Sequence, residues 1–164
     1  MYNKWQQMYQ AKLTTADEAV AMIRDGEVIS SAFGNGQPVR LYEALVKRIL
    51  EGKLFKPTVL AATLVGGMSL MNPEVKDKIE FDSVFVGDER ERIKEGYFTY
   101  SPVKFGDLQN ISVQGLRPVQ VSVMRVSPMD RHGFFSTGVN VDFGWDMAKS
   151  NPHRRLLIVE VNHF

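Results

Sequence analysis

The sequence predicts an α/β domain built on an open, mainly parallel sheet flanked by helices. Segments typical of strands alternate with segments typical of helices along the whole chain, which is the order found in α/β folds. Two strand segments, residues 58–65 (TVLAATLV) and 156–161 (LLIVEV), are almost continuously apolar, as parallel strands buried on both faces are. Three strand segments run directly into a glycine, at Gly34, Gly66 and Gly87. A glycine at such a position favours a turn out of the sheet toward a helix.

Two helices are predicted before the first strand. The first dozen residues carry apolar side chains at helical spacing and predict a short amphipathic helix. Because a short helix alone is marginal in water, we expect it to dock on another part of the molecule. Residues 15–18 (TADE) form a capping box, which begins a second helix, and we expect that helix to end at Gly26.

The first strand and the helix after it follow directly. Residues 27–33 (EVISSAF) are typical of a strand, and residues 34–38 (GNGQP) of a loop, with Pro38 suited to the first turn of a helix. An apolar stripe over residues 41–49 predicts that helix, with Glu43 and Lys47 as a favourable surface pair.

The rest of the chain continues the alternation. The elements expected after Gly52 are a buried strand at 58–65, a short helix at 70–76, a strand at 79–86, a charged helix at 88–95, an extended segment at 97–104, a short helix at 105–111, a strand at 119–126, a helical turn or two at 145–150 and a last buried strand at 156–161.

Composition and charge exclude several classes of function. The chain has 164 residues, about the size of one domain, and a net charge of +1 from 20 basic and 19 acidic residues. This balance gives no electrostatic reason to expect nucleic acid or an anionic membrane as a partner. The chain has no cysteine, which excludes a disulfide framework and a cysteine nucleophile. It has no apolar run of membrane-spanning length, so we expect a cytoplasmic protein.

Two glycine-containing turns are candidate binding elements. The turn that contains Gly34, Gly36 and Gln37 could offer backbone N–H groups and a helix N-terminus to an anion. It lacks the third glycine of a dinucleotide-binding fingerprint, and a plain strand-to-helix turn is the alternative. Gly66 and Gly67 could let a ligand approach the backbone closely, with another strand-exit turn as the alternative.

The loop after residues 119–126 is the third candidate. Pro128 stops the strand, and Asp130, His132, Gly133 and Ser136 follow it. Open α/β sheets bind ligands beyond the carboxyl ends of their strands, so we expect this loop to face a ligand. His132 close to Asp130 could act as a general base, but the sequence supplies no positioned nucleophile, and a structural histidine is the alternative.

Other titratable residues give weaker signals. The two remaining histidines share no metal-ligand spacing with His132, so we predict no metal site. Glu160 lies within a buried strand segment. It could be a functional acid, but pairing with a buried cation is the plainer interpretation.

Taken together, these motifs resemble the N-terminal half of the acetyl-CoA hydrolase/transferase family, which includes 4-hydroxybutyrate and butyrate–acetate CoA-transferases. The run Ser-Pro-x-Asp-x-His-Gly-Phe-x-Ser-x-Gly at residues 127–138 carries the most weight. The other matching stretches are Trp5 through Val20; Pro38 with Leu41, Ala44 and Leu45; residues 85–87 with Arg90 and Gly96; Tyr100 with Pro102 and Phe105; and residues 158–162.

The resemblance implies a class I CoA-transferase-like domain whose enzyme works through a glutamyl-CoA thioester. In the family the nucleophilic glutamate and the main glycine-rich CoA segment lie in the C-terminal half, so we assign no catalytic residue to this chain. We expect residues 1–164 to be an incomplete N-terminal domain of a chain that continues. Its substrate-facing residues are then Gly34, Gly36, Gln37, Gly66, Gly67, Asp130, His132, Gly133 and Ser136.

The resemblance also implies ligands and partners. Coenzyme A or an acyl-CoA is expected as a substrate, with no permanently bound cofactor, and a small carboxylate is expected as the acceptor. A C-terminal CoA-transferase domain or chain is the expected partner, and we expect a homo-oligomer. An acyl-CoA hydrolase of the same family and a non-catalytic binding module are the alternatives.

Overall fold

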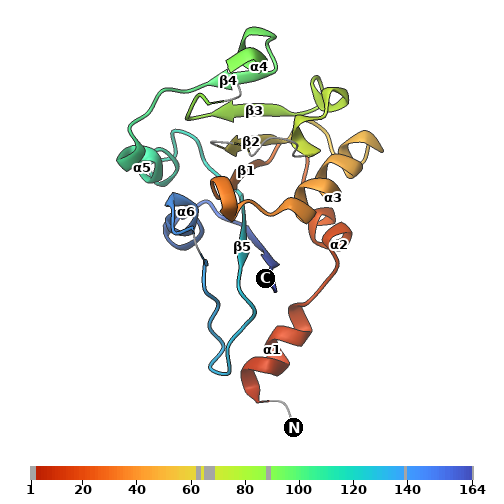
Figure 1. Cartoon of the computed structure of the whole chain (residues 1–164), viewed down its shortest axis with the longest axis vertical. Helices are drawn as coiled ribbons and strands as arrows, with labels where there is room; N and C mark the ends of the chain where they lie inside the picture. The colour runs from red at the N-terminus through yellow and green to blue at the C-terminus, as the bar shows by residue number, and fades with distance from the viewer. Residues whose placement is uncertain (1–2, 62–63, 65–68, 88–89, 139, 164) are drawn as a thin grey trace.

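The computed structural model describes residues 3–61, 64, 69–87, 90–138 and 140–163. In these residues six strands form one sheet in the order β4-β3-β2-β1-β5-β6, and every neighbouring pair is parallel (Figure 1). The predicted open, parallel α/β fold is confirmed. The strands are β1 (Val28–Ser31), β2 (Thr58–Ala61), β3 (Glu80–Ser83), β4 (Phe98–Tyr100), β5 (Val121–Val126) and β6 (Leu156–Val161).

The strand order reverses between β1 and β5. From β1 the chain adds strands outward on one side as far as β4, and it then returns to the other side of β1 for β5 and β6. Ile29 at the centre of β1 is in register with Val59 of β2 and with Val121 of β5. In open α/β sheets, ligands bind outside the carboxyl ends of the strands at this reversal, which is called the switch point.

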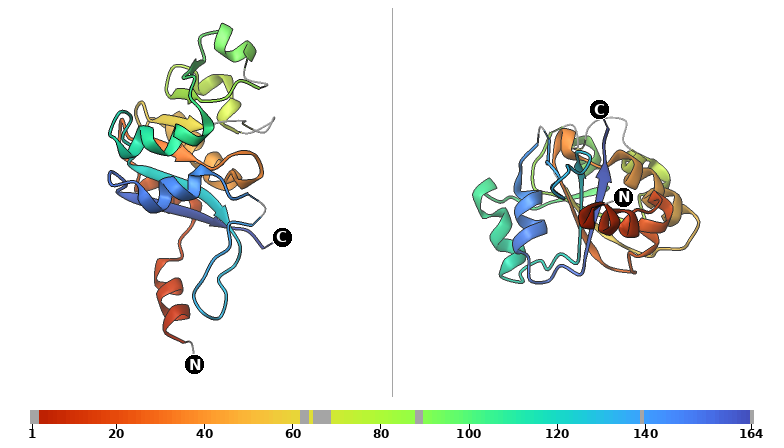
Figure 2. Two further views of the ribbon diagram at one scale, coloured as in Figure 1. Left: turned by 90° about the vertical axis from the view of Figure 1, so that its left-hand side faces the viewer. Right: turned by 90° about the horizontal axis from the view of Figure 1, so that it is seen from below.

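Helices cover both faces of the sheet (Figure 2). One face carries α2 (Ala16–Ala21) and α3 (Val39–Leu50), and the other carries α5 (Leu108–Val113) and α6 (Phe143–Ser150). The remaining elements are α1 (Lys4–Lys12), η1 (Gly34–Gly36), η2 (Ser69–Met71), η3 (Pro73–Val75), α4 (Arg90–Lys94) and η4 (Phe105–Asp107). No helix among these ranges is long and apolar enough to cross a membrane.

Strand alternation divides the core between the two faces. Val121, Val123 and Ile158 pack into the large cluster that contains the apolar side of α3. Met124 and Val126 point the other way and pack in a smaller cluster with α6. Successive side chains of a strand point to opposite faces, so the apolar runs seen in the sequence fill both layers.

The predicted helix ends are confirmed in part. The capping box is present, because the Glu18 N–H donates to Thr15 Oγ1 at 3.2 Å and the Thr15 N–H donates to Glu18 Oε2 at 3.0 Å. The expected end at Gly26 is wrong, since α2 ends at Ala21 with Met22 as its cap. Gly26, at φ +70°, instead donates its N–H to the Phe55 carbonyl at 3.0 Å.

The surface pair expected on α3 is also wrong. Lys47 Nζ lies 2.8 Å from Asp17 Oδ2 and therefore joins α3 to α2. Glu43 pairs with Arg40 at 3.0 Å instead. The basic partner one turn earlier holds Glu43, and the neighbouring helix offers Lys47 a carboxylate within reach.

Candidate functional site

The switch point lies where the β1–α3 turn meets the segment that leads into α6. Gly34 begins the turn at φ +46°, and the Gln37 side chain is completely buried. A Cβ atom on Gly36 would lie 2.6 Å from Asn140 Nδ2 and 3.1 Å from Ala32 Cβ. Only a glycine lets the two segments approach this closely.

Asp142 holds the beginning of this turn. Its Oδ2 accepts a hydrogen bond from the Phe33 N–H at 2.6 Å and another from Asn140 Nδ2 at 2.8 Å. Its Oδ1 accepts from the Gly144 N–H at 2.7 Å and thereby caps α6. Asn140 Nδ2 also donates to the Phe33 carbonyl. One carboxylate therefore fixes the exit of β1 and the start of α6 together.

Glu160 of β6 holds the end of the same turn. Its Oε2 accepts from the Arg40 N–H at 2.7 Å and from the Leu41 N–H at 3.1 Å, both in the first turn of α3. Its Oε1 lies 3.3 Å from Arg125 Nε, on the residue opposite Glu160 in the β5–β6 register. The predicted pairing of Glu160 with a cation is confirmed, and the hydrogen bonds to α3 are an addition that the sequence did not indicate.

A buried phenol lies between these two carboxylates. Tyr42 is 1% exposed, and its hydroxyl bonds the Ser31 hydroxyl at the end of β1. Burial raises the pKa of Tyr42, and the negative charges of Glu160 and Asp142 raise it further. The hydroxyl therefore stays protonated and serves as a fixed dipole at the end of the strand.

A small cavity opens at this position. Its lining comes from the β1 exit, β5, the returning end of the loop after β5, and the first turn of α6. The lining residues are Ala32, Gly36, Met124, Arg125, Thr137, Asn140, Asp142 and Trp145. The cavity has a volume of about 10 Å³, which is room for one water-sized group, and its polar side chains are Arg125, Thr137, Asn140 and Asp142. It marks the position outside the strand ends where open α/β sheets bind ligands.

The tip of the loop after β5 lies away from this cavity. Residues 127–138 leave the sheet edge and run beside α1, and we call α1 together with residues 127–138 the arm (Figures 1 and 2). Trp5 packs so closely on Gly133 that a Cβ atom there would lie 2.8 Å from the indole ring. The Tyr9 and Phe135 rings lie 5.8 Å apart. The expected docking of the first helix is thus confirmed, on the arm and not on the core.

Hydrogen bonds within the loop shape the arm. Asp130 Oδ1 accepts from the N–H groups of His132 and Phe134, each at 2.8 Å. These backbone bonds, the one from Phe134 above all, lower the pKa of Asp130. Arg131 Nε lies 2.9 Å from His132 Nε2. Asp130 therefore binds the backbone N–H of His132 and not its imidazole ring. The two side chains do not form the carboxylate–imidazole pair that general base catalysis would use.

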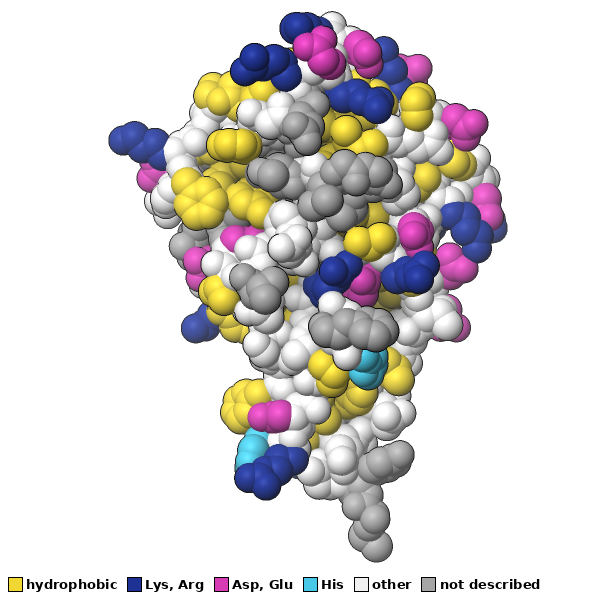
Figure 3. Space-filling model, viewed as in Figure 1, with side chains coloured by type: hydrophobic (Ala, Val, Ile, Leu, Met, Phe, Trp, Pro, Cys, Tyr) yellow, Lys and Arg dark blue, Asp and Glu magenta, His cyan; other side chains and the backbone are white. Residues whose placement is uncertain are grey.

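The arm is exposed on its outer side. Figure 3 shows hydrophobic, acidic, basic and histidine side chains together over the lower end of the molecule, where the arm lies. Phe134 is 71% exposed and Trp5 is 44% exposed. The arm thus presents aromatic surface, whereas the switch point presents a narrow polar cavity.

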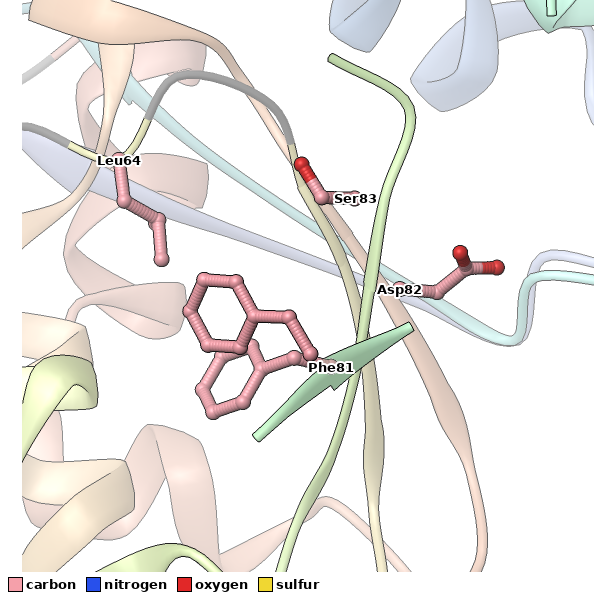
Figure 4. Close-up of a pocket in the computed structure, with 5 residues that line it drawn as sticks. Leu64, Phe81, Asp82 and Ser83 are labelled. Carbon is pink, nitrogen blue, oxygen red and sulfur yellow. The ribbon is translucent and has the colours of Figure 1, made fainter. Parts of the chain in front are cut away.

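A second cavity lies beside β3. Leu64, Phe81, Asp82, Ser83 and Phe98 line it. Figure 4 shows the Phe81 ring directed toward Leu64 and the Asp82 carboxylate directed away, toward the other face of the sheet. Asp82 is 3% exposed and forms an ion pair with Arg117. This cavity is a gap in the aromatic packing, since its charged member is turned out of it and is already paired.

Comparison with known proteins identifies the family. The family model described as acetyl-CoA hydrolase/transferase N-terminal domain matches residues 2–164. The chain belongs to the acetyl-CoA hydrolase/transferase family. The resemblance seen in the sequence motifs is confirmed.

Two curated relatives in this family are CoA-transferases. Butyryl-CoA:acetate CoA-transferase from Anaerostipes caccae is 32% identical over 161 residues, which cover 94% of this chain and 34% of that protein. The 4-hydroxybutyrate coenzyme A transferase from Clostridium kluyveri is 28% identical over 160 residues, which cover 97% of this chain and 36% of that protein. The chain spans about a third of the length of these curated relatives.

Solved structures show the same fold. RipA from Yersinia pestis is 29% identical with a TM-score of 0.86, over 98% of this chain and 38% of that chain. A 4-hydroxybutyrate CoA-transferase from Porphyromonas gingivalis is 17% identical with a TM-score of 0.60, over 98% of this chain and 42% of that chain. At that lower identity the second likeness concerns the fold alone.

The structure separates the residues predicted to face a ligand in this family domain. Gly34, Gly36 and Gln37 lie at the switch point. Ser136, which joins Ser127 through hydrogen bonds of 2.8 and 2.9 Å, closes the base of the arm next to the cavity residue Thr137. The tip of the arm carries Asp130, His132 and Gly133. Residues 66 and 67 lie outside the described residues.

Three site residues have roles that the sequence analysis did not assign. Asp142 stands directly before an aromatic helix start, a typical helix-capping signal that could have indicated its role. Asn140 and Glu160 form hydrogen bonds with residues more than 100 positions earlier in the chain, and no local sequence pattern predicts such a contact. Within the described ranges, no cluster of three or more His, Asp or Glu side chains could hold a metal ion.

Proposed function

We propose that this chain is the N-terminal, substrate-facing domain of an acyl-CoA:carboxylate CoA-transferase of the 4-hydroxybutyrate or acetate/butyrate type. The observation that carries the proposal is the match to a butyryl-CoA:acetate CoA-transferase at 32% identity along 94% of the chain. The polar cavity at the switch point supports it, because this is where an open parallel sheet offers a ligand site. Coenzyme A enters as part of the substrate and not as a resident cofactor.

The proposed reaction uses a glutamate in a C-terminal domain or chain that works with this one. Its carboxylate attacks the thioester carbon of the acyl-CoA and releases the CoA thiolate, which leaves an acyl-glutamyl anhydride. The thiolate then attacks the glutamyl carbon, so that a glutamyl-CoA thioester forms and the first acid departs. An incoming carboxylate reverses both steps and leaves as the new acyl-CoA. Two easier steps replace one difficult exchange, and the acyl group stays activated throughout.

The part of this chain in that reaction is to form one wall of the substrate cleft. We propose that Gly34, Gly36 and Gln37 line the wall, with Ser136 at its edge. Asp142 and Glu160 lock the backbone of the wall, which supplies the fixed geometry that positioning requires. The tip of the arm would join the site only where the substrate or the second domain extends to it. We also propose that the working enzyme is a homo-oligomer.

Two alternative functions are an acyl-CoA hydrolase of the same family and a non-catalytic binding module. In an acyl-CoA hydrolase, water would take the acyl group in place of the second carboxylate. A non-catalytic binding module would hold the ligand without any exchange. The relatives named as CoA-transferases favour CoA transfer over hydrolysis and over binding without catalysis.

The test is acyl exchange between butyryl-CoA and free acetate, followed by mass spectrometry of the acyl-CoA products. We expect no exchange with the 164-residue chain alone and exchange when it is joined to the C-terminal part of a relative. Release of free CoA without exchange would establish the hydrolase. Binding of butyryl-CoA with neither reaction would establish the binding module. Exchange by the chain alone would contradict the assignment of the nucleophile to another domain.

A further inference from the structure

Helix α3 begins without a capping side chain of its own. Pro38 occupies the cap position and offers no side-chain hydrogen bond. The first N–H groups of a helix have no partner within the helix, and together with the helix dipole they attract an anion. In doubly wound folds this place, just after the first strand of the switch point, is where a ligand's phosphate commonly binds.

In this protein a carboxylate from the edge strand β6 fills that place. Glu160 Oε2 lies 2.7 Å from the Arg40 nitrogen and 3.1 Å from the Leu41 nitrogen, at hydrogen-bonding distance of both. The Glu160 side chain is only 15% exposed. The contact joins residues 119 and 120 positions apart in the sequence, so it is a property of the folded sheet and not of a local turn.

Arg125 is the second positively charged group that faces the Glu160 carboxylate. Its Nε atom is buried and makes no hydrogen bond to the described residues, and Glu160 Oε1 lies 3.3 Å away. Arg125 also lines the switch-point cavity. A guanidinium whose Nε atom is buried is favoured by a nearby negative charge, and Glu160 supplies it from within the protein. The helix N-terminus and the arginine thus share one internal anion.

We propose that Glu160 is a built-in anion that closes the N-terminus of α3 to the charged groups of the substrate. The β1–α3 turn would then face the uncharged acyl part of an acyl-CoA, while phosphates and free carboxylates are held elsewhere. Glu160 is a positioning and specificity residue and not a catalytic one. The proposal rests on the proposed function for the identity of the ligand, whereas the closure of the helix does not depend on that function.

Inorganic sulfate tests the closure without any enzymatic activity. In Glu160→Ala the N–H groups of Arg40 and Leu41 and the guanidinium of Arg125 lose their anion together. We expect sulfate to bind this variant about tenfold more tightly than it binds the unaltered chain, measured by calorimetry against chloride at equal ionic strength. Glu51→Ala is the matched control, because it removes an exposed negative charge from the opposite end of α3 and leaves the N-terminus of the helix closed. Equal sulfate affinity in all three proteins would overturn the proposal.

The unaltered chain supplies a second measurement that does not depend on how the variant folds. In a sulfate titration followed by NMR, we expect the amide signals of Arg40 and Leu41 to stay in place. Saturable shifts of both signals would show that the helix N-terminus is open to anions and would overturn the proposal. Because neither readout involves acyl exchange, failure of the proposed function and failure of this inference are distinguishable.

Discussion

The switch point and the arm both lie beyond strand ends, yet they are held in different ways. At the switch point, Asp142 and Glu160 tie together β1, α3, α6 and β6 through contacts between residues 109 to 120 positions apart. In the arm, Asp130 binds N–H groups two and four positions away. The first region is fixed by the whole fold, while the second is ordered mainly by itself and by one exposed helix. Precise placement of a substrate needs the first kind of support.

We expect the largest difference in the free energy of unfolding between variants that remove one carboxylate from the switch point or one from the arm. Asp142→Ala leaves the Phe33 and Gly144 N–H groups without their acceptor and removes the cap of α6, so we expect a loss of about 3 kcal/mol in the free energy of unfolding. Asp130→Ala is the matched change in the arm, and we expect a much smaller loss, because Asp130 is exposed and its hydrogen bonds hold only the loop. Urea unfolding followed by circular dichroism measures both. Similar losses in the two variants would erase the contrast between the regions.

The sheet and the strand ends could be predicted from the sequence, because apolar runs and the glycines that follow them are local patterns. Residues 27–33, 119–126 and 156–161 each contain the strand that was expected there. The long-range hydrogen bonds of Asp142 and Glu160 could not be predicted in the same way. A glutamate within LLIVEV indicates that a partner exists, but only the folded sheet shows that the partner is the N-terminus of α3.

A second, smaller effect is expected from a methyl group added to the switch point. In Gly36→Ala the new Cβ would lie 2.6 Å from Asn140 Nδ2, so that Asn140 or the turn must move at a cost of about 2 kcal/mol. Gly106→Ala is the control, since a Cβ atom there meets nothing within 4 Å. Thermal unfolding of the two variants compares them. Equal midpoints would mean that the turn and Asn140 do not approach each other as closely as the structure shows.

The pH dependence of the arm sharpens the comparison further. The pKa of the Asp130 carboxyl is lowered in the folded protein, so the ionised carboxylate stabilises the folded arm. This stabilisation is fully present above the unfolded pKa of about 3.9, and it is lost as the pH falls through the lowered pKa of the folded protein. We expect the His132 and Phe134 amides to exchange faster with solvent below that window, while the Ala32 amide, which donates to the Val123 carbonyl in the sheet, is still protected. Hydrogen exchange followed by NMR separates the two. Loss of protection at all three amides together would show that the arm and the core open as one unit.

The smallest effect is expected from His132→Ala in the chain joined to a C-terminal part. The imidazole has no carboxylate partner in the arm, so we expect acyl exchange to fall far less than the roughly 100-fold or more that loss of a general base produces. The rate of butyryl-CoA–acetate exchange measures this. A loss of about 100-fold with the fold intact would give His132 a direct part in the reaction.

The most direct measurement for the account as a whole is hydrogen exchange of the joined, active protein with and without butyryl-CoA. If the switch point is the substrate-facing region, butyryl-CoA slows exchange in residues 33–42 and 136–145 and leaves residues 129–135 at the tip of the arm unchanged. Slower exchange confined to residues 129–135 would contradict the account and would place the substrate on the arm.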